Sequence, residues 1–266
     1  MENMYKEALG DTETSIWVAI GGNDDINTGK FDSPYASIAK AIAACTTARH
    51  DIHVMPGAYT HSDDADITIN GTKIVGVGAV SINCSGCTTY GFKTVFGAAT
   101  GTKEVTFKNL SINAGAKVGI QLDNVGATAK VNCYLYDVEI YNTSNSYSAV
   151  DVDHTVVAGQ GIRLYAYRCI FKGKIDVVVG DNGDRFRFKY CELRGGLVSS
   201  AADYDAEFAF LWTEVLLAGI TGGHANQRAI VGACITETNA DPNVYLGAVA
   251  GDVATQTEQL ITFPGA

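Results

Sequence analysis

The sequence predicts an all-β protein: a right-handed, three-sheeted parallel β-helix, or solenoid, with an N-terminal capping helix. The first observation is a recurring pattern of two apolar residues at period two, a polar or bulky corner, and a second apolar pair. It covers residues 105–112, 133–140, 164–171 and 186–193. Each copy describes two strands that meet at a bend too short for a hairpin. The matching positions Leu110, Val138, Cys169 and Cys191 are 28, 31 and 22 residues apart (138−110, 169−138 and 191−169), a period that suits one rung of a solenoid.

The second observation is another strand that recurs within the same repeats. Segments 119–123, 149–153 and 174–178 follow one another at offsets of 30 and 25 residues (149−119 and 174−149). Alternate residues of a strand face opposite sides, so one apolar set is expected to point inward. That set is Ile120, Leu122, Val150, Val152, Ile175 and Val177. Three strands per rung around one interior predict the solenoid. A β-sandwich would not require the same strand-bend-strand pattern at equivalent positions of successive repeats.

Composition is the third observation. The chain has 266 residues, 18% of them charged, and 29 glycines, which suits one extended domain with many turns. The net charge of −10 argues against a nucleic-acid partner and against an acidic membrane surface, unless charges are segregated by face. No segment has the uninterrupted apolar length of a membrane span. The first residues lack a basic region followed by an apolar run, so we expect synthesis in a cytoplasm without a signal peptide.

Four parts are predicted along the chain: an N-terminal arm over 1–14, a capping strand and helix over 15–50, the parallel β-helix over 51–250, and a C-terminal strand or tail over 251–266. In the second part, Ser33 is the expected helix N-cap and Pro34 the first helical residue. Apolar residues then form one stripe of this helix, which would cover the open end of the first rung. They are Ile38, Ala41, Ile42 and Cys45.

The seven cysteines are expected to be reduced. Cys133, Cys169 and Cys191 occupy inward positions, where a thiol packs as a small apolar group. Cys84 and Cys87 form one CxxC without the second pair that a zinc site needs. The histidines share no ligand motif either, so no metal and no cofactor is predicted.

Three stretches near the N-terminus resemble a known superfamily. They are Gly22-Asn23-Asp24-Asp25, the segment 33–42 (SPYASIAKAI) and the segment 52–60 (IHVMPGAYT). Together they are similar to the opening of pectin-lyase-like right-handed β-helix proteins, a resemblance that covers about residues 20–60 and extends loosely to about 240. The superfamily includes phage tailspikes, virion decoration proteins and secreted polysaccharide-cleaving enzymes. The resemblance therefore implies the fold and leaves the activity to the site.

An acidic row is the candidate catalytic site if the protein is an enzyme. Asp151, Asp153 and Asp176 would point outward from neighbouring rungs stacked about 4.8 Å apart. Glycosidases need two carboxyl groups about 5 Å or 6.5–9.5 Å apart, and one carboxyl of a close pair is held protonated as a general acid. The other interpretation is that these side chains face water, a cation or a subunit contact. We favour it, because the superfamily's catalytic signatures occur only as fragments, such as Asn142-Thr143-Ser144 and Gly223-His224-Ala225.

A second acidic group follows the first strands of the solenoid. Asp63, Asp64 and Asp66 could form a calcium loop, since hard cations are bound by clustered oxygen ligands. A solvated turn is the preferred interpretation, because no further acceptors follow at a ligand-like spacing.

Outward tyrosines are the predicted binding or interface residues. Tyr134, Tyr136, Tyr165 and Tyr167 suit a side-by-side contact or a glycan-facing surface, because tyrosine offers area and a hydroxyl at low ordering cost. Phe263, in the last strand, is expected to close the final rung or to pair with a neighbouring subunit.

Three functions fit these observations. The preferred one is a non-enzymatic structural protein of a phage virion, a trimeric capsid decoration, cement or spike protein. Its partners would be two further copies of itself and the major capsid or another virion protein. The second is a tailspike-type glycosidase or lyase acting on bacterial surface polysaccharide. The third is a non-catalytic carbohydrate-binding β-helix, with a glycan as partner.

Overall fold

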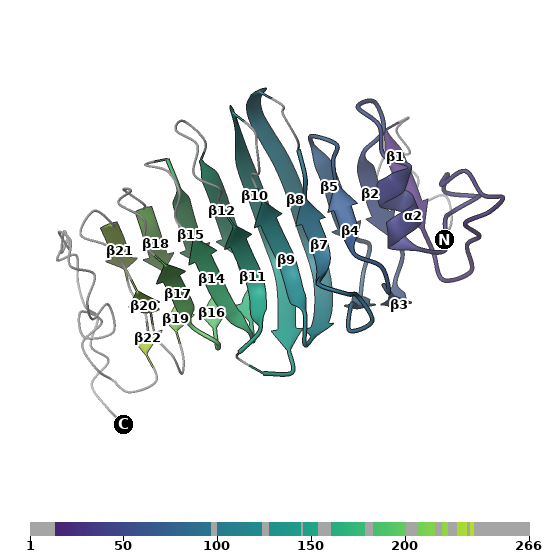
Figure 1. Ribbon diagram of the computed structural model, residues 1–266. Coiled ribbons are helices and arrows are strands. Elements are labelled where there is room, and N and C mark those ends of the chain that lie inside the picture. Colours follow the sequence, from purple (N-terminus) through teal and green to yellow (C-terminus); the bar gives the residue numbers. More distant parts are fainter. Residues whose placement is uncertain are drawn as a thin grey trace.

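The computed structural model places the chain in an elongated stack of parallel strands (Figure 1). It describes residues 14–96, 100–123, 128–144, 146–153, 161–178, 183–200, 207–215, 220–222, 228–232 and 235–236. Every strand pair in this part of the chain is parallel, and the strands form three ladders that run along the stack. The predicted parallel β-helix is therefore confirmed.

Each ladder takes one strand from each rung. The first ladder holds β1 (Ser15–Val18), β2 (Asp51–Val54), β5 (Thr72–Gly76), β8 (Thr100–Gly115), β10 (Thr128–Asn142), β12 (Ile162–Tyr167), β15 (Arg185–Lys189), β18 (Glu207–Leu211) and β21 (Arg228–Gly232). The second holds β3 (Gly57–Thr60), β6 (Val80–Asn83), the later halves of β8 and β10, β13 (Ile170–Phe171), β16 (Glu192–Leu193), β19 (Glu214–Val215) and β22 (Ile235–Thr236). The third holds β4 (Ala65–Ile67), β7 (Tyr90–Thr94), β9 (Val118–Asp123), β11 (Ser148–Asp153), β14 (Lys174–Val178), β17 (Leu197–Ser200) and β20 (Ile220–Gly222).

The interior follows the predicted alternation. All six inward residues expected from the second recurring strand are fully buried. The corner-flanking positions are buried too: Leu110, Val138, Cys169 and Cys191. Phenylalanines stack along the axis in the same interior: the Phe188 and Phe210 ring centroids lie 5.4 Å apart, and those of Phe186 and Phe208 lie 5.0 Å apart. Side chains of the same type lie above one another in successive rungs, because the register between neighbouring rungs is constant at these positions. They therefore form one continuous core.

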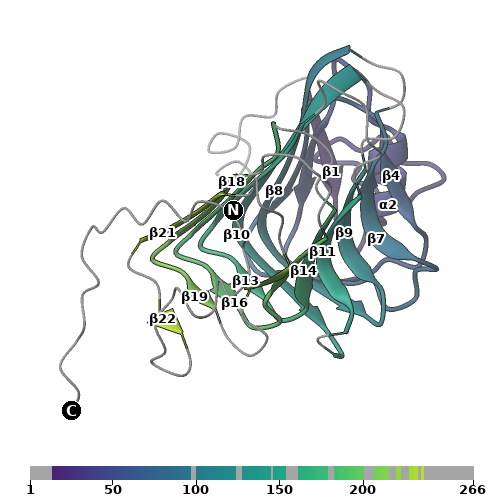
Figure 2. The same ribbon diagram turned by 60° about the vertical axis from the view of Figure 1, so that its left-hand side comes forward.

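The bend between the first and second ladders has one backbone conformation in five successive rungs. A single residue in each rung has a positive φ of between 52° and 57°. These residues are Asn109, Asp137, Arg168, Tyr190 and Trp212, which we call the corner column. A left-handed residue turns the chain sharply without a hairpin, and Figure 2 shows the resulting angle between the β8–β10 side and the β13–β16–β19 side.

The N-terminal helix begins later than the sequence suggested. Helix α2 spans Ile38–Ala43, and its N-cap is Ser37, whose Oγ accepts a hydrogen bond from the Lys40 N–H at 3.1 Å. The prediction of Ser33 as N-cap is wrong because the preceding loop holds this segment extended. Asp24 Oδ1 accepts hydrogen bonds from the backbone N–H groups of residues 36 and 37, at 2.7 and 3.1 Å. The predicted stripe is buried at Ile38, Ala41 and Ile42, and α2 lies beside β1, the first strand of the stack (Figure 1).

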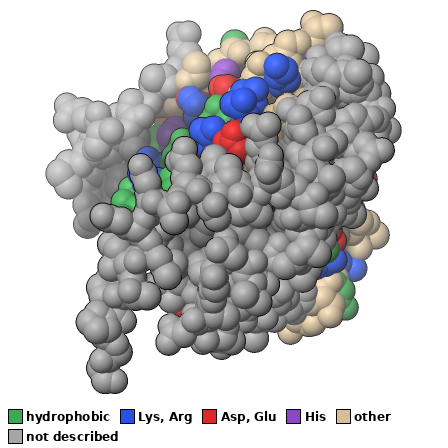
Figure 3. All heavy atoms as spheres, turned by 90° about the vertical axis from the view of Figure 1, so that its left-hand side faces the viewer, with side chains coloured by type: hydrophobic (Ala, Val, Ile, Leu, Met, Phe, Trp, Pro, Cys, Tyr) green, Lys and Arg blue, Asp and Glu red, His purple; other side chains and the backbone are tan. Residues whose placement is uncertain are grey.

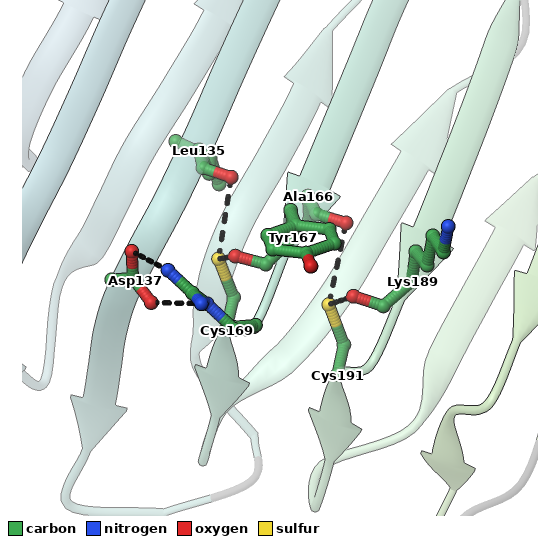
Figure 4. Close-up of polar contacts among 8 residues, drawn as sticks. Leu135, Asp137, Ala166, Tyr167, Cys169, Lys189 and Cys191 are labelled. Carbon is green, nitrogen blue, oxygen red and sulfur yellow. Dashed lines mark hydrogen bonds and ion pairs between the residues drawn. The ribbon is translucent and has the colours of Figure 1, made fainter.

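The cysteines pack as expected from the sequence. Cys133, Cys169 and Cys191 are buried, and the six cysteines in the described part of the chain are free thiols. Cys169 Sγ donates to the Leu135 carbonyl at 3.5 Å and Cys191 Sγ to the Ala166 carbonyl at 3.4 Å (Figure 4). A hydrogen bond with the Cys191 thiol, and then burial, raises the pKa of Cys169. The Cys169 thiol therefore stays protonated at neutral pH.

No helix among the described residues is long and apolar enough to cross a membrane.

Candidate functional site

The outer face of the first ladder carries a block of four tyrosines, which we call the tyrosine face. The register places Tyr134 beside Tyr165 and Tyr136 beside Tyr167. The rings of Tyr134 and Tyr165 are stacked with centroids 5.3 Å apart and an interplanar angle of 13°. Tyr134 and Tyr136 are parallel within 2°, at 6.4 Å. The predicted outward orientation is confirmed, because strand β12 alternates buried and partly exposed residues along its length.

Cations of the following rung border this face. The Arg187 guanidinium lies 5.9 Å from the centre of the Tyr165 ring, and it also forms an ion pair with Glu207 at 2.7 Å. The next residue in the column is Ala209, whose small side chain leaves a depression of about 410 Å³ between Tyr165 and Leu211. Viewed from the C-terminal end, Figure 3 shows cationic and anionic side chains intermixed in the described part of the surface. The face therefore offers apolar rings beside an arginine that is paired with a glutamate.

The acidic row predicted from the sequence lies on the third ladder. The register places Asp151 between Gln121 and Asp176, as expected from the repeat offsets. Gln121 Nε2 donates to Asp151 Oδ2 at 3.4 Å, and Lys174 Nζ contacts Asp176 Oδ2 at 2.5 Å. Burial, and then the charges of Asp176 and Asp153, raise the pKa of Asp151 to about 6. One carboxyl of the row thus keeps its proton in mildly acidic solution while its neighbour is held by a lysine.

Asp153 is paired in the register with Asp123 of the preceding rung, and the two carboxyl groups differ in exposure. Asp153 is exposed, but Asp123 is buried, and its carboxylate forms an ion pair with Lys93 at 2.7 Å. Asp123 is therefore occupied by the protein itself. Phe263 lies outside the described residues, so the role predicted for it stays a prediction.

The acidic loop after the first rung strands organises local backbone. Asp64 accepts hydrogen bonds from the N–H groups of Thr88 and Thr89 at 2.8 and 3.0 Å, and Asp66 accepts one from the Tyr90 hydroxyl at 2.8 Å. Throughout the described segments, no cluster of three or more histidine, cysteine, aspartate or glutamate side chains is placed to hold a metal ion.

A groove beside the corner column is the feature that the sequence reading missed. Two adjoining depressions of about 580 and 460 Å³ share Arg168 and Ile170, and together they extend along the axis from Gly57 to Glu214. We call this feature the corner groove. One wall is the corner column, and the floor is the start of each second-ladder strand. The only sequence signal was the bulky corner residue of each repeat, whose orientation depends on a left-handed φ that the pattern alone does not show.

The corner groove is lined by ion pairs. Arg168 holds Asp137 of the preceding rung through two bonds of 2.7 Å, and Figure 4 shows both of these bonds as dashed lines to the Asp137 carboxylate. Lys172 contacts Glu139 at 2.5 Å, and Arg194 contacts Glu192. These pairs fix the positions of the carboxylates along the groove and leave little net charge there.

Comparison with known proteins shows the family. Residues 20–199, well over half of the chain, match a family described as "Protein of unknown function (DUF1565)", and the chain belongs to that family. No curated protein matches it. One solved structure, a GH136 lacto-N-biosidase from Eubacterium ramulus in its selenomethionine derivative, is similar at 11% identity, with a TM-score of 0.23, over 88% of this chain and 69% of that one. A likeness at that TM-score carries no argument about activity.

Proposed function

We propose that this protein is a non-enzymatic structural component of a phage virion, a homotrimeric decoration, cement or spike protein. The observation that carries the proposal is the tyrosine face: a rigid, partly exposed aromatic block on the flat outer side of a solenoid. The proposed partners are two further copies of the chain and the major capsid protein or another virion protein. Because a virion protein leaves the cell by lysis, the proposed location is the particle.

The tyrosine face suits a contact between copies for two physical reasons. Stacked rings such as Tyr134 and Tyr165 are already ordered, so burying them costs little side-chain entropy. Arg187, which borders Tyr165, is already paired with Glu207, so burying this cation in a contact leaves it with its partner. An aromatic centre with a polar rim is the usual anatomy of a stable protein interface.

Native mass spectrometry at micromolar concentration tests this proposal. The expected result is a trimer for the wild-type chain and a monomer for the double variant Tyr134→Ser/Tyr165→Ser, with circular dichroism unchanged. The matched control is Tyr147→Ser, which removes a tyrosine that is 40% exposed and outside the face. A wild-type monomer, or a double variant that stays trimeric, would refute the interface.

A second candidate function rests on Asp151. A carboxyl with a pKa raised to about 6 beside a second carboxylate is the arrangement that a glycosidase uses as general acid and base. On this alternative the protein is a tailspike-type enzyme that cleaves bacterial surface polysaccharide, with Asp151, Asp153 and Asp176 as candidates. Release of reducing ends from host capsule and lipopolysaccharide would test it. Asp151→Asn and Asp176→Asn should each abolish that release, while Asp25→Asn in an exposed loop should not.

A further inference from the structure

We propose that Cys84 and Cys87 form a reversible dithiol–disulfide pair, and that its co-reactant is a small-molecule disulfide such as oxidised glutathione. The two residues are the CxxC of the sequence, and they lie in the turn that joins β6 to β7. This turn leads from the second ladder to the third, outside both the tyrosine face and the corner groove. The proposal does not depend on the proposed virion function.

The first argument is the geometry of the turn. The Cys87 N–H donates to the Cys84 carbonyl at 3.0 Å, which closes a four-residue β-turn. The first and fourth Cα atoms of such a turn lie within about 7 Å of one another, and disulfides span Cα separations of about 4.4–6.8 Å. The two thiol groups also share a hydrogen bond. Gly91 makes room for them, since a Cβ there would lie 2.8 Å from Cys84 Sγ. A bond between the two sulfur atoms therefore needs little movement of the backbone.

The second argument is that the turn itself does not require cysteine. The same turn recurs 30 residues later (114−84 and 117−87), where the Lys117 N–H donates to the Ala114 carbonyl at 3.0 Å. Ala114 is buried, as Cys84 is, but Lys117 extends its ammonium group to a backbone carbonyl in an exposed contact. Cys87 is instead only 2% exposed, and its Sγ donates to the His61 carbonyl at 3.2 Å. The second thiol is therefore turned inward to the first, which the backbone of the turn alone does not explain.

The third argument is access. The two residues between the cysteines, Ser85 and Gly86, are exposed, so the thiols lie directly beneath a surface turn. Such turns open locally at a smaller cost in free energy than strands of the core. The other hydrogen-bonded thiol pair, Cys169 and Cys191, belongs to two successive rungs, which would have to separate before a reagent could enter. A small disulfide therefore reaches the CxxC pair first.

The reaction is a thiol–disulfide exchange in two steps. A hydrogen bond with Cys84 lowers the pKa of the Cys87 thiol, so Cys87 is the first nucleophile. Its thiol gives up a proton, the thiolate bonds to one sulfur of oxidised glutathione, and the other glutathione leaves as a thiolate. Cys84 then gives up its proton and attacks the Cys87 sulfur, and the second glutathione leaves. Two protein thiols thus lose two electrons to form one disulfide, and one molecule of oxidised glutathione is reduced to two thiols.

Peptide mass spectrometry tests the pair directly. The full chain is equilibrated with mostly oxidised or mostly reduced glutathione, and free thiols are then blocked with iodoacetamide. In the oxidised buffer, the peptide that carries Cys84 and Cys87 is expected to be unalkylated and lighter by two hydrogen atoms than its dithiol form. Return to the reduced buffer should restore both free thiols. Cys133, Cys169 and Cys191 should be alkylated after unfolding in both buffers, because they stay reduced.

Alanine variants then test the order of attack. Cys84→Ala, which copies Ala114 of the next rung, should accumulate a mixed disulfide between Cys87 and glutathione, because the thiol that would displace it is missing. Cys87→Ala should accumulate about tenfold less adduct at Cys84. The matched control is Cys45→Ser, which removes a thiol elsewhere in the chain and should form the Cys84–Cys87 disulfide as the wild type does.

Three results would overturn the inference. The first is a wild-type chain whose Cys84 and Cys87 both stay free in the oxidised buffer. The second is a disulfide between Cys169 and Cys191 that forms in preference to the CxxC disulfide. The third is an equal amount of adduct in Cys84→Ala and Cys87→Ala, which would mean that the two thiols do not act in order.

Discussion

The N-terminal and C-terminal parts of the corner column have the same backbone conformation but different side chains. Asn109 and Tyr190 have φ values of 55° and 57°, in equivalent places of their rungs. Asn109 uses its amide to donate to the Gly76 and Gly78 carbonyls at 2.8 and 3.0 Å, which ties its rung to the preceding one. Tyr190 instead stacks beside Trp212 at the surface. The difference teaches that a repeated backbone position can stabilise the fold in one rung and present a surface in another.

The largest expected effect tests whether the two ends share one core. Phe107 and Phe188 are both fully buried, two residues before Asn109 and Tyr190. Phe107→Ala and Phe188→Ala should each lower the free energy of unfolding by about 3–5 kcal/mol, because each deletes a buried aromatic ring. Denaturant unfolding at equal protein concentration measures both. A cost confined to one of them would show that the two ends are not equivalent inside.

The next effect addresses the stabilising end. Asn109→Ala should lower the free energy of unfolding by roughly 1–3 kcal/mol, since it removes two hydrogen bonds and places a Cβ-bearing residue without a polar side chain at a left-handed φ. Asn109→Gly is the matched control, because glycine loses the hydrogen bonds without the backbone strain and should cost less. Equal costs for the two variants would mean that backbone strain contributes nothing at this corner.

An intermediate effect uses the third ladder as a region outside the corner. The pKa of Asp151 is raised to about 6 in the folded state, above the ordinary value of 3.8 for an aspartate side chain. The folded chain therefore holds a proton that the unfolded chain has lost, and stability should fall as pH rises from about 4 to about 6 and then level off. Allowing for solvent screening, the loss should be on the order of 1–2 kcal/mol.

Asp151→Asn is expected to remove that pH dependence and to be more stable than the wild type at pH 7. Urea unfolding at pH values between 4 and 7 would check the result, with Trp212→Asn as a control in which the pH dependence persists. A stability that rises with pH over this range would contradict the raised pKa.

The smallest effect addresses the presenting end of the column. Trp212→Asn should raise the free energy of unfolding slightly, by about 0.5–1 kcal/mol, because asparagine relieves the left-handed strain of an exposed residue. This change in the free energy of unfolding has the opposite sign to the change expected for Asn109→Ala. Thermal unfolding of the variant beside the wild type measures it; a destabilised variant would mean that Trp212 contributes to the fold.

Much of the fold was predictable from the repeated strand-bend-strand pattern. Leu110, Val138 and Cys169 were placed inside by period-two patterning alone, and all three are buried. The helix start was misplaced because Asp24, twelve residues earlier than Ala36, caps the chain at residues 36 and 37. A local signature such as Ser33-Pro34 carries no information about that loop contact.

The candidate sites divide in the same way. The Asp151–Asp176 neighbourhood followed from strand offsets and is present in the register, but the raised pKa depends on burial that no offset reveals. The corner groove could not be predicted, because it combines Gly57 with Trp212 and therefore the register of many rungs. Trp212 in particular lies exposed at a corner, which its apolar character alone does not indicate.

By itself, the sequence determined the interior of this protein. Burial of apolar side chains at alternate positions is a local rule that is repeated in each rung. It determines which side chains of every strand point into the core. Only the tertiary structure decided what the outside presents, since side chains such as Asp137 and Arg168 become neighbours through a rung 31 residues long (168−137). Rung lengths vary between repeats, so the partners of a surface side chain depend on how all the rungs stack. Only the tertiary structure shows that stacking.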